Sequence, residues 1–342
     1  MTFLVWRQYR LQWAIALAVL AAFAAVELVN GIHMASSWHS LVHVCASTPV
    51  AQHGPQGQGG QSGQGNGCLG QNIVGVVGND LRILSVMVPA ILGILWGAPL
   101  IAHELESGTA GFVLTQGITR NRWLAGKIGL LLLAAALWAG AISALVTWWS
   151  GPENAQRADA FQPNYFDTQG ITPVGYAIFA MALGIAAGAV LRRTIPAIAV
   201  TLAGFIGFRL FFNDVLRQHL MPAVTTVTSM TSTWSPGGIS WVLNAGMLNA
   251  AGQAPDVAGQ FSTYGVDGVP STMLPAACQA LAASPNQTPV LTCLSKAGYH
   301  QFVTYQPGSR YWDFQGIEVG VYVLVAAALL AIAWYAIRRR DA

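Results

Sequence analysis

Charged residues are scarce in this sequence of 342 residues, in which Asp, Glu, Lys and Arg together account for 8% and apolar residues for 54%. Soluble domains usually carry about a quarter charged residues, so the composition excludes an ordinary soluble protein and indicates a membrane protein. The formal net charge of +3 is small, and basic runs occur only near the chain ends. Nucleic acid is therefore not an expected partner.

Catalytic signatures are also lacking. The sequence contains no G-x-S-x-G, no H-E-x-x-H and no paired carboxylates at a useful spacing inside an apolar run. The nearest approach to a phosphate loop, residues 125–128 (AGKI), lacks the first glycine and the Ser or Thr after the lysine. The chain is thus predicted to be no enzyme and to bind no cofactor itself.

No metal site is predicted either. Four histidines cluster near Cys45, but their spacings fit no tight Cys/His zinc pattern, and the neighbouring tract is rich in Gly and Gln. These histidines are His33, His39, His43 and His53.

Six apolar runs are long enough to cross a bilayer, whose hydrocarbon core of about 30 Å requires roughly 20 residues of helix. They cover residues 11–32, 83–102, 123–149, 172–191, 195–213 and 316–337. Only three residues separate the fourth run from the fifth, which predicts a tight helical hairpin. The predicted fold class is an all-α integral membrane protein with six transmembrane helices. The first run could instead be a cleaved signal peptide, which would leave five spans, but its length favours a span.

Lys and Arg placement predicts the orientation, because positive charges mark cytoplasmic connections. Ten of the 16 basic residues lie in four short segments on one side of the predicted spans, so both termini are expected on the cytoplasmic side of the plasma membrane and the number of spans is expected to be even. These residues are Arg7, Arg10, Arg120, Arg122, Lys127, Arg192, Arg193, Arg338, Arg339 and Arg340.

This orientation predicts the layout of the chain. Residues 1–10 form a cytoplasmic amphipathic elbow, and residues 11–213 hold spans one to five. Within them, 34–80 is an outer loop and 103–123 an inner connection. Residues 214–315 form a large extracellular loop domain, and 316–342 hold span six and a cytoplasmic arginine tail. In the large loop, 234–252 and 272–284 are predicted as short helices or partly buried segments.

The sequence has only four cysteines, and all of them fall in the predicted outer loops. An oxidising compartment permits disulfides there, and an even number of cysteines supports pairing. The pairs Cys45–Cys68 and Cys278–Cys293 are favoured because each closes a local loop, although pairing between the loops remains open.

Ionisable residues inside spans are costly and mark function by default. Glu27 and Arg209 lie toward the outer ends of spans one and five, and Glu318 lies at the outer end of span six. One interpretation is an ion-paired gate or a polar substrate contact. The alternative is interfacial snorkelling together with a structural Glu–Arg pair between helices.

The most polar stretch between two apolar runs begins at His103 and continues through E-S-G-T, residues 106–109, to L-T-Q-G-I-T-R-N-R-W-L-A-G-K. This stretch resembles the permeases of type-2 ABC exporters. The runs V-P-A-I-L-G-I-L-W-G-A-P-L-I-A-H-E and Y-Q-P-G-S-R-Y-W-D-F-Q-G-I-E look like the actinobacterial branch of that family. The resemblance implies six spans, a second permease copy (a homodimer or a heterodimer) and two ATPase subunits that bind ATP and Mg²⁺.

The resemblance also implies that 103–123 is a coupling helix that docks on the ATPase. Carboxylates suit the positive end of a helix dipole, a glycine permits a sharp turn, and a threonine can cap the helix that follows. The alternative is a solvated turn whose charges only set the topology. The candidate coupling residues are Glu104, Glu106, Gly108, Thr109, Phe112, Arg120 and Arg122.

The resulting functional hypothesis is export of a hydrophobic or amphipathic compound, such as a drug, a lipid or a secondary metabolite. A path between two protomers would use spans one, two and five, although aromatic residues in spans also serve helix packing. The alternatives are a sensor of an extracellular compound and a passive channel or structural protein. The candidate path or gate residues are Glu27, Trp96, Phe205, Phe208 and Arg209.

Overall fold

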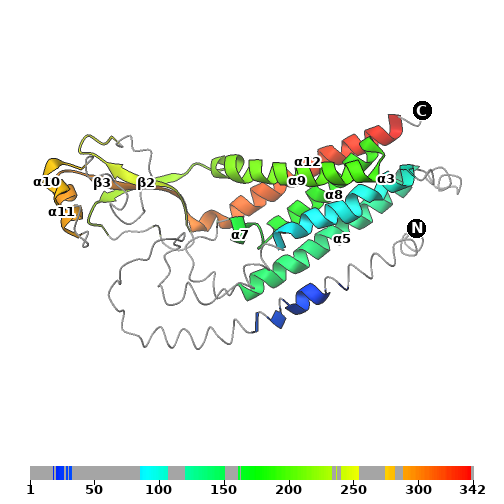
Figure 1. Cartoon of the computed structure of the whole chain (residues 1–342), viewed down its shortest axis with the longest axis horizontal. Helices are drawn as coiled ribbons and strands as arrows, with labels where there is room; N and C mark the ends of the chain where they lie inside the picture. Colours follow the sequence, from blue (N-terminus) through cyan, green and yellow to red (C-terminus); the bar gives the residue numbers. More distant parts are fainter. Residues whose placement is uncertain are drawn as a thin grey trace. The chain divides into compact units, whose positions relative to one another are not determined.

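The computed structural model describes residues 18, 21–26, 28–29, 31–32, 85–106, 120–150, 161, 163–232, 236, 240–253, 274–281 and 288–339. They form two compact units (Figure 1): a helical unit, and a sheet unit made of Ala158–Phe161 and Met221–Tyr311. Five described helices are long and apolar enough to cross a membrane: Ser85–Ala102, Leu124–Trp148, Thr172–Leu191, Thr194–His219 and Gly308–Arg338. They correspond to predicted spans two to six, whereas half of predicted span one lies outside the described residues.

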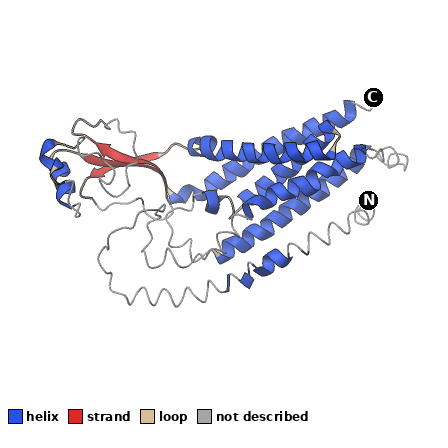
Figure 2. Ribbon diagram, in the orientation of Figure 1, coloured by secondary structure: helices blue, strands red, loops and turns tan. Residues whose placement is uncertain are grey.

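The helical unit contains all the long helices (Figure 2). Predicted span two ends in the π-helix η1 and then α3, and predicted span five continues beyond residue 213 through η2 and η3, so it is longer than expected. The elements are η1 Gly93–Gly97, α3 Ala98–Glu106, α5 Arg120–Trp149, α7 Pro163–Phe166, α8 Thr172–Leu191, α9 Thr194–Phe211, η2 Phe212–Leu216, η3 Arg217–His219 and α12 Tyr311–Arg339.

Span two packs backbone to backbone against α8. A Cβ atom placed on Gly184 would lie 2.6 Å from the Gly93 carbonyl oxygen and 2.7 Å from the Ala98 nitrogen. A Cβ on Gly188 would lie 2.7 Å from the Ala98 oxygen. Glycines spaced by four therefore line both sides of this contact, at 93 and 97 in span two and at 184 and 188 in α8. Such spacing lets membrane helices approach closely, where dispersion replaces the missing hydrophobic effect.

The hairpin between α8 and α9 is confirmed. Arg192 adopts the left-handed conformation with φ 54° and caps α8, and Arg193 is extended with φ −134°. Pro173 and Pro196 lie in the first turns of α8 and α9, where a missing backbone N–H costs little. Two residues thus suffice to reverse the chain, and we call this the hairpin end of the helical unit.

At the opposite end, which we call the network end, side chains of α5 and α12 fix the turn that precedes α8. Ser143 of α5 donates a hydrogen bond to the Gly170 carbonyl oxygen (2.7 Å). The Gln315 amide of α12 accepts one from the Ile171 nitrogen (2.9 Å) and donates one to the Gln169 oxygen (3.1 Å). Gly170 has φ 69°, and the Gln315 amide occupies the place of its absent side chain. This turn therefore enters α8 in one defined conformation.

The sheet unit contains a three-stranded antiparallel sheet in the order β1–β3–β2, formed by β1 Val224–Ser229, β2 Trp241–Leu248 and β3 His300–Gln306 (Figure 2). Val224 faces Tyr305 across β1 and β3, and Leu248 faces His300 across β2 and β3. Of the two alternatives predicted for 234–252, the short helix is wrong for β2 and the partly buried segment is right, because β2 is a strand of mostly half-buried residues. The all-α prediction therefore does not hold for this unit. Pairing with β3, more than 50 residues away, decides the conformation of β2.

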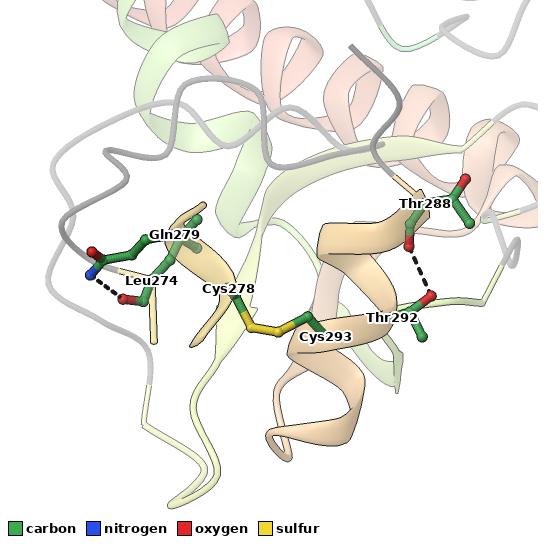
Figure 3. The surroundings of a disulfide bond; sticks show 6 residues. All are labelled: Leu274, Cys278, Gln279, Thr288, Thr292 and Cys293. Atoms are coloured by element: carbon green, nitrogen blue, oxygen red, sulfur yellow. Dashed lines mark hydrogen bonds between the residues drawn. A yellow bond between two sulfur atoms is a disulfide. The ribbon is translucent and has the colours of Figure 1, made fainter. Parts of the chain in front are cut away.

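Two short helices complete the sheet unit: α10 Ala276–Gln279, as predicted for 272–284, and α11 Thr288–Lys296. The 3₁₀-helix η5, Gly308–Arg310, follows β3. A disulfide joins Cys278 to Cys293 with a sequence separation of 15 (Figure 3), which confirms that predicted pair. Cys278 is buried with Met230, Met247 and Leu294 in the core of the unit. Cys45 and Cys68 lie outside the described residues.

Replacing Cys278 and Cys293 together by alanine should lower the stability of the sheet unit by about 3 kcal/mol, because the bridge closes a 15-residue loop. Limited proteolysis of the full chain in detergent should then cut the sheet unit faster, and dithiothreitol should have the same effect on the wild type. Lys296→Ala, at an exposed position of α11, is the control. Equal cleavage rates of the double variant and the wild type would contradict the prediction.

Candidate functional site

The network end holds a buried cluster of four charges. Arg209 of α9 donates to Asp167 Oδ2 (2.5 Å), and Arg217 of η3 donates to Asp167 Oδ1 (2.5 Å). Arg217 also donates through Nε to Glu318 Oε2 and through Nη2 to Glu318 Oε1, both at 3.0 Å. Asp167 follows α7, and Glu318 belongs to α12. Two arginines thus meet two carboxylates, and the cluster, which we call the charge network, is formally neutral.

The π-helix η2 brings both arginines to one side of their helix. Eight residues of regular α-helix would separate Arg209 and Arg217 by about 80° around the axis. A π-turn absorbs one extra residue, which reduces that offset to about 20°. Because η2 lies between the two residues, both guanidinium groups can reach Asp167. The irregular turn is what allows a single carboxylate to pair with two arginines.

Aromatic rings complete the surroundings of the network. The Tyr176 hydroxyl of α8 lies 2.5 Å from Glu318 Oε1 and 3.0 Å from Asp167 Oδ1, and its one proton can be donated to either carboxylate. Arg209 Cζ lies 4.2 Å from the centroid of the Tyr176 ring, and Arg217 Cζ lies 4.4 Å from that of Phe166. Cation–π contacts are strongest when the cation is desolvated, as it is here.

Burial gives the network its energetic significance. The side chains of Arg217, Asp167 and Glu318 are 2%, 3% and 1% exposed. Buried ion pairs gain little net stability over an apolar core, but removal of one partner leaves an uncompensated charge that costs several kcal/mol. The network therefore holds α8, α9 and α12 together at one end. Removal of any one charged side chain would leave the buried cluster with an uncompensated charge.

The structure places the predicted path residues at different sites. Arg209 lies in the charge network, which was the structural alternative to a substrate contact. Phe205 is buried, and Phe208 packs beside it on Phe179 and Tyr322 in an aromatic cluster. Trp96 is half-buried against a separate apolar core. Glu27 lies outside the described residues, and a role of these residues in a path stays a prediction.

Sequence reasoning missed Asp167, Tyr176 and Arg217. Span five was predicted to end at residue 213, so Arg217 was assigned to a loop and its helical spacing from Arg209 was not considered. Asp167 belongs to a short connection that looks solvated in the sequence. An acidic residue directly before span four, together with two arginines near the end of span five, was the available signal.

At the hairpin end, Glu106 connects the end of α3 to the beginning of α9. Its Oε2 atom accepts hydrogen bonds from the backbone nitrogen of Thr194 (3.1 Å) and from the Thr194 hydroxyl (2.8 Å). Nearby, the Lys127 ammonium of α5 is buried and lies 3.4 Å from the Leu100 oxygen of α3. Gly108, Thr109 and Phe112 lie outside the described residues, as do the side chains of Glu104, Arg120 and Arg122.

The family model described as ABC-2 membrane transporter related matches residues 17–217 of this chain. That range is more than half of the chain. The chain belongs to the ABC-2 membrane transporter related family. No curated protein and no solved structure matches it.

Membership in the ABC-2 family and the five apolar helices make this chain a multi-pass membrane protein and a permease subunit of an ABC transporter. Such permeases are transport components that work with ATPase subunits and are generally non-catalytic themselves. The matched range contains the segment between α3 and α5 and ends at Arg217, so three of the four charged residues of the network lie inside it. Glu318 and the sheet unit, apart from its Ala158–Phe161 segment, lie outside it.

Proposed function

We propose that this ABC-2 permease is the transmembrane subunit of an exporter that moves a hydrophobic or amphipathic compound, such as a drug, a lipid or a secondary metabolite, out of the cell. It would act as a dimer, with an identical or a related second copy, together with two ATPase chains that bind ATP and Mg²⁺. Both termini would lie in the cytoplasm below the plasma membrane. The two motifs that look actinobacterial support the plasma membrane of such a bacterium.

The observation that carries this proposal is the family match over 17–217, because that range holds most of predicted span one, the predicted spans two to five and the predicted coupling segment. The scarcity of ionisable groups on the described spans supports an apolar cargo. The charge network supports a closed outer end within one protomer, which leaves the contact between two protomers as the route for the cargo.

A sensor function is the second candidate, and the sheet unit favours it. This unit has its own buried core and a disulfide, as expected for a folded module on the outer side of a membrane. In such a complex the sheet unit would bind an extracellular compound, and ATP hydrolysis would drive signalling with little transport.

Affinity purification of the full chain from its native membranes in mild detergent tests the proposal. We expect a protein with a Walker A motif to copurify, and the reconstituted complex should accumulate fluorescent amphipathic dyes or lipid analogues in inside-out proteoliposomes only with ATP. A non-hydrolysable ATP analogue is the control. Hydrolysis without movement of any probe would favour the sensor, and the absence of any ATPase would overturn both candidates.

A further inference from the structure

Glu106 is the last residue of α3 and lies near the start of the predicted coupling segment, 103–123. Its carboxylate crosses 88 positions of sequence to reach the first residue of α9, where it accepts both the Thr194 N–H and the Thr194 O–H. Two hydrogen bonds to one carboxylate oxygen fix the direction of this side chain. The contact therefore joins the end of span two to the beginning of span five.

The start of α9 requires such an acceptor. The first N–H groups of a helix have no partner within the helix and are normally satisfied by a capping side chain. The capping position here is Arg193, whose side chain makes no capping hydrogen bond and has no acceptor atom to offer. A carboxylate at this position also interacts favourably with the positive end of the helix dipole. Glu106 thus accepts the N–H at the start of α9, which the capping residue Arg193 cannot do.

The contact lies on a tightly packed part of the helical unit. Ala98 and Ala102 of α3 form one buried cluster with Ala187 of α8 and Ala197 of α9. Only two residues link α8 to α9, and α3 meets α8 without room for a Cβ at Gly188. The two hydrogen bonds of Glu106 are exposed, and they add a direct link between the end of α3 and the beginning of α9 beside this packed cluster.

We propose that Glu106 is a positioning residue that caps α9 and so transmits movement of the coupling segment to span five, instead of serving as the contact to the ATPase. This inference rests on the proposed function, and it reassigns one of the predicted docking residues. Gly108, Thr109 and Phe112 then remain as the candidates for the docking surface itself.

The test measures movement of α9 in the purified complex with its ATPase. Spin labels are attached to Leu133→Cys on α5 and Leu202→Cys on α9, both at exposed positions, after Cys45 and Cys68 are replaced by serine. The distance between the labels is compared without nucleotide and with ATP and vanadate. The wild-type contact should give a distance shift, and Glu106→Ala should abolish most of it while the ATPase still copurifies.

Three further variants separate capping from docking. Glu106→Gln keeps an acceptor oxygen and should retain most of the shift. Thr194→Val removes one of the two donors and should reduce the shift partly, and the double variant Glu106→Ala/Thr194→Val should be no worse than Glu106→Ala alone. Asp214→Ala, an exposed acidic position beyond the other end of α9, is the matched control. Thermal unfolding of each variant checks that the spans remain folded.

Each outcome decides between the two roles. A full shift in Glu106→Ala, additive effects in the double variant, or loss of the copurified ATPase in Glu106→Ala would overturn the inference. If Glu106→Ala unfolds, the distance shifts of Glu106→Gln and Thr194→Val become the test. An unchanged shift in Thr194→Val would then overturn the inference. Absence of an ATPase from the wild-type purification overturns the proposed function, whereas failure in the variants alone overturns only this inference.

Discussion

Arg217→Ala should destabilise the helical unit by roughly 3–5 kcal/mol, which is the usual cost of removing one partner from a buried ion pair. The substitution leaves Glu318 without its two-point partner and leaves Asp167 paired with Arg209 alone. Both carboxylates are almost fully buried, so water cannot replace the guanidinium group without opening the helices. We expect a large loss of monodisperse protein in detergent and a lower midpoint of thermal unfolding.

Two other variants define the cause of that loss. Arg217→Lys keeps the charge but cannot form the paired hydrogen bonds to Glu318, so it should rescue stability only in part. Arg338→Ala removes an exposed arginine from the far end of α12 and should change the unfolding midpoint little. If Arg217→Ala unfolds at the same temperature as Arg338→Ala, the charge network does not hold the helices together.

Gly184→Ala should be the most damaging conservative substitution in the spans. The added methyl group would lie 2.6 Å from the Gly93 oxygen, 2.7 Å from the Ala98 nitrogen and 2.9 Å from the Gly97 carbonyl carbon. All three are backbone atoms, so no side chain can turn away and α8 must separate from span two. Overpacking of this kind typically costs about 1–3 kcal/mol. Separation of span two would also displace α3, and with it the beginning of the coupling segment.

The same substitution at Gly207 provides the matched control. Gly207 lies in the middle of α9, and a Cβ there would have no atom within 4 Å among the described residues. Gly207→Ala should therefore be neutral, or stabilising by up to about 1 kcal/mol, because alanine is the better helix former. Thermal unfolding and size-exclusion profiles of the two variants, measured in the same detergent, give the comparison. Equal behaviour at both positions would contradict the close approach of α8 and span two.

The helices of the helical unit were predictable because each span must satisfy its own backbone hydrogen bonds in lipid. That constraint makes a run of about 20 apolar residues sufficient evidence for a helix, and α8 begins and ends at the predicted residues. The Cys278–Cys293 pair was predictable for a similar reason, since a local loop needs no knowledge of distant contacts.

The sheet unit shows where local reasoning ends. The residues of β2 carry small and apolar side chains that suit a short helix as well as a strand. Their conformation depends on β3, which lies more than 50 residues later in the chain and pairs with β1 and β2 on its two sides. No pattern within 234–252 contains that information.

The sequence by itself determined that this is a membrane protein and where five of its helices run. It also showed the resemblance to a type-2 ABC permease. All three depend on composition, apolar run length and short motifs, which need no knowledge of distant contacts. Only the tertiary structure decided what the polar side chains do. Asp167, Arg209, Arg217 and Glu318 come from three distant segments and form one neutral, buried cluster. Glu106 likewise forms hydrogen bonds with Thr194 that the sequence did not predict, because the acceptor and its donors meet only when span two packs beside span five.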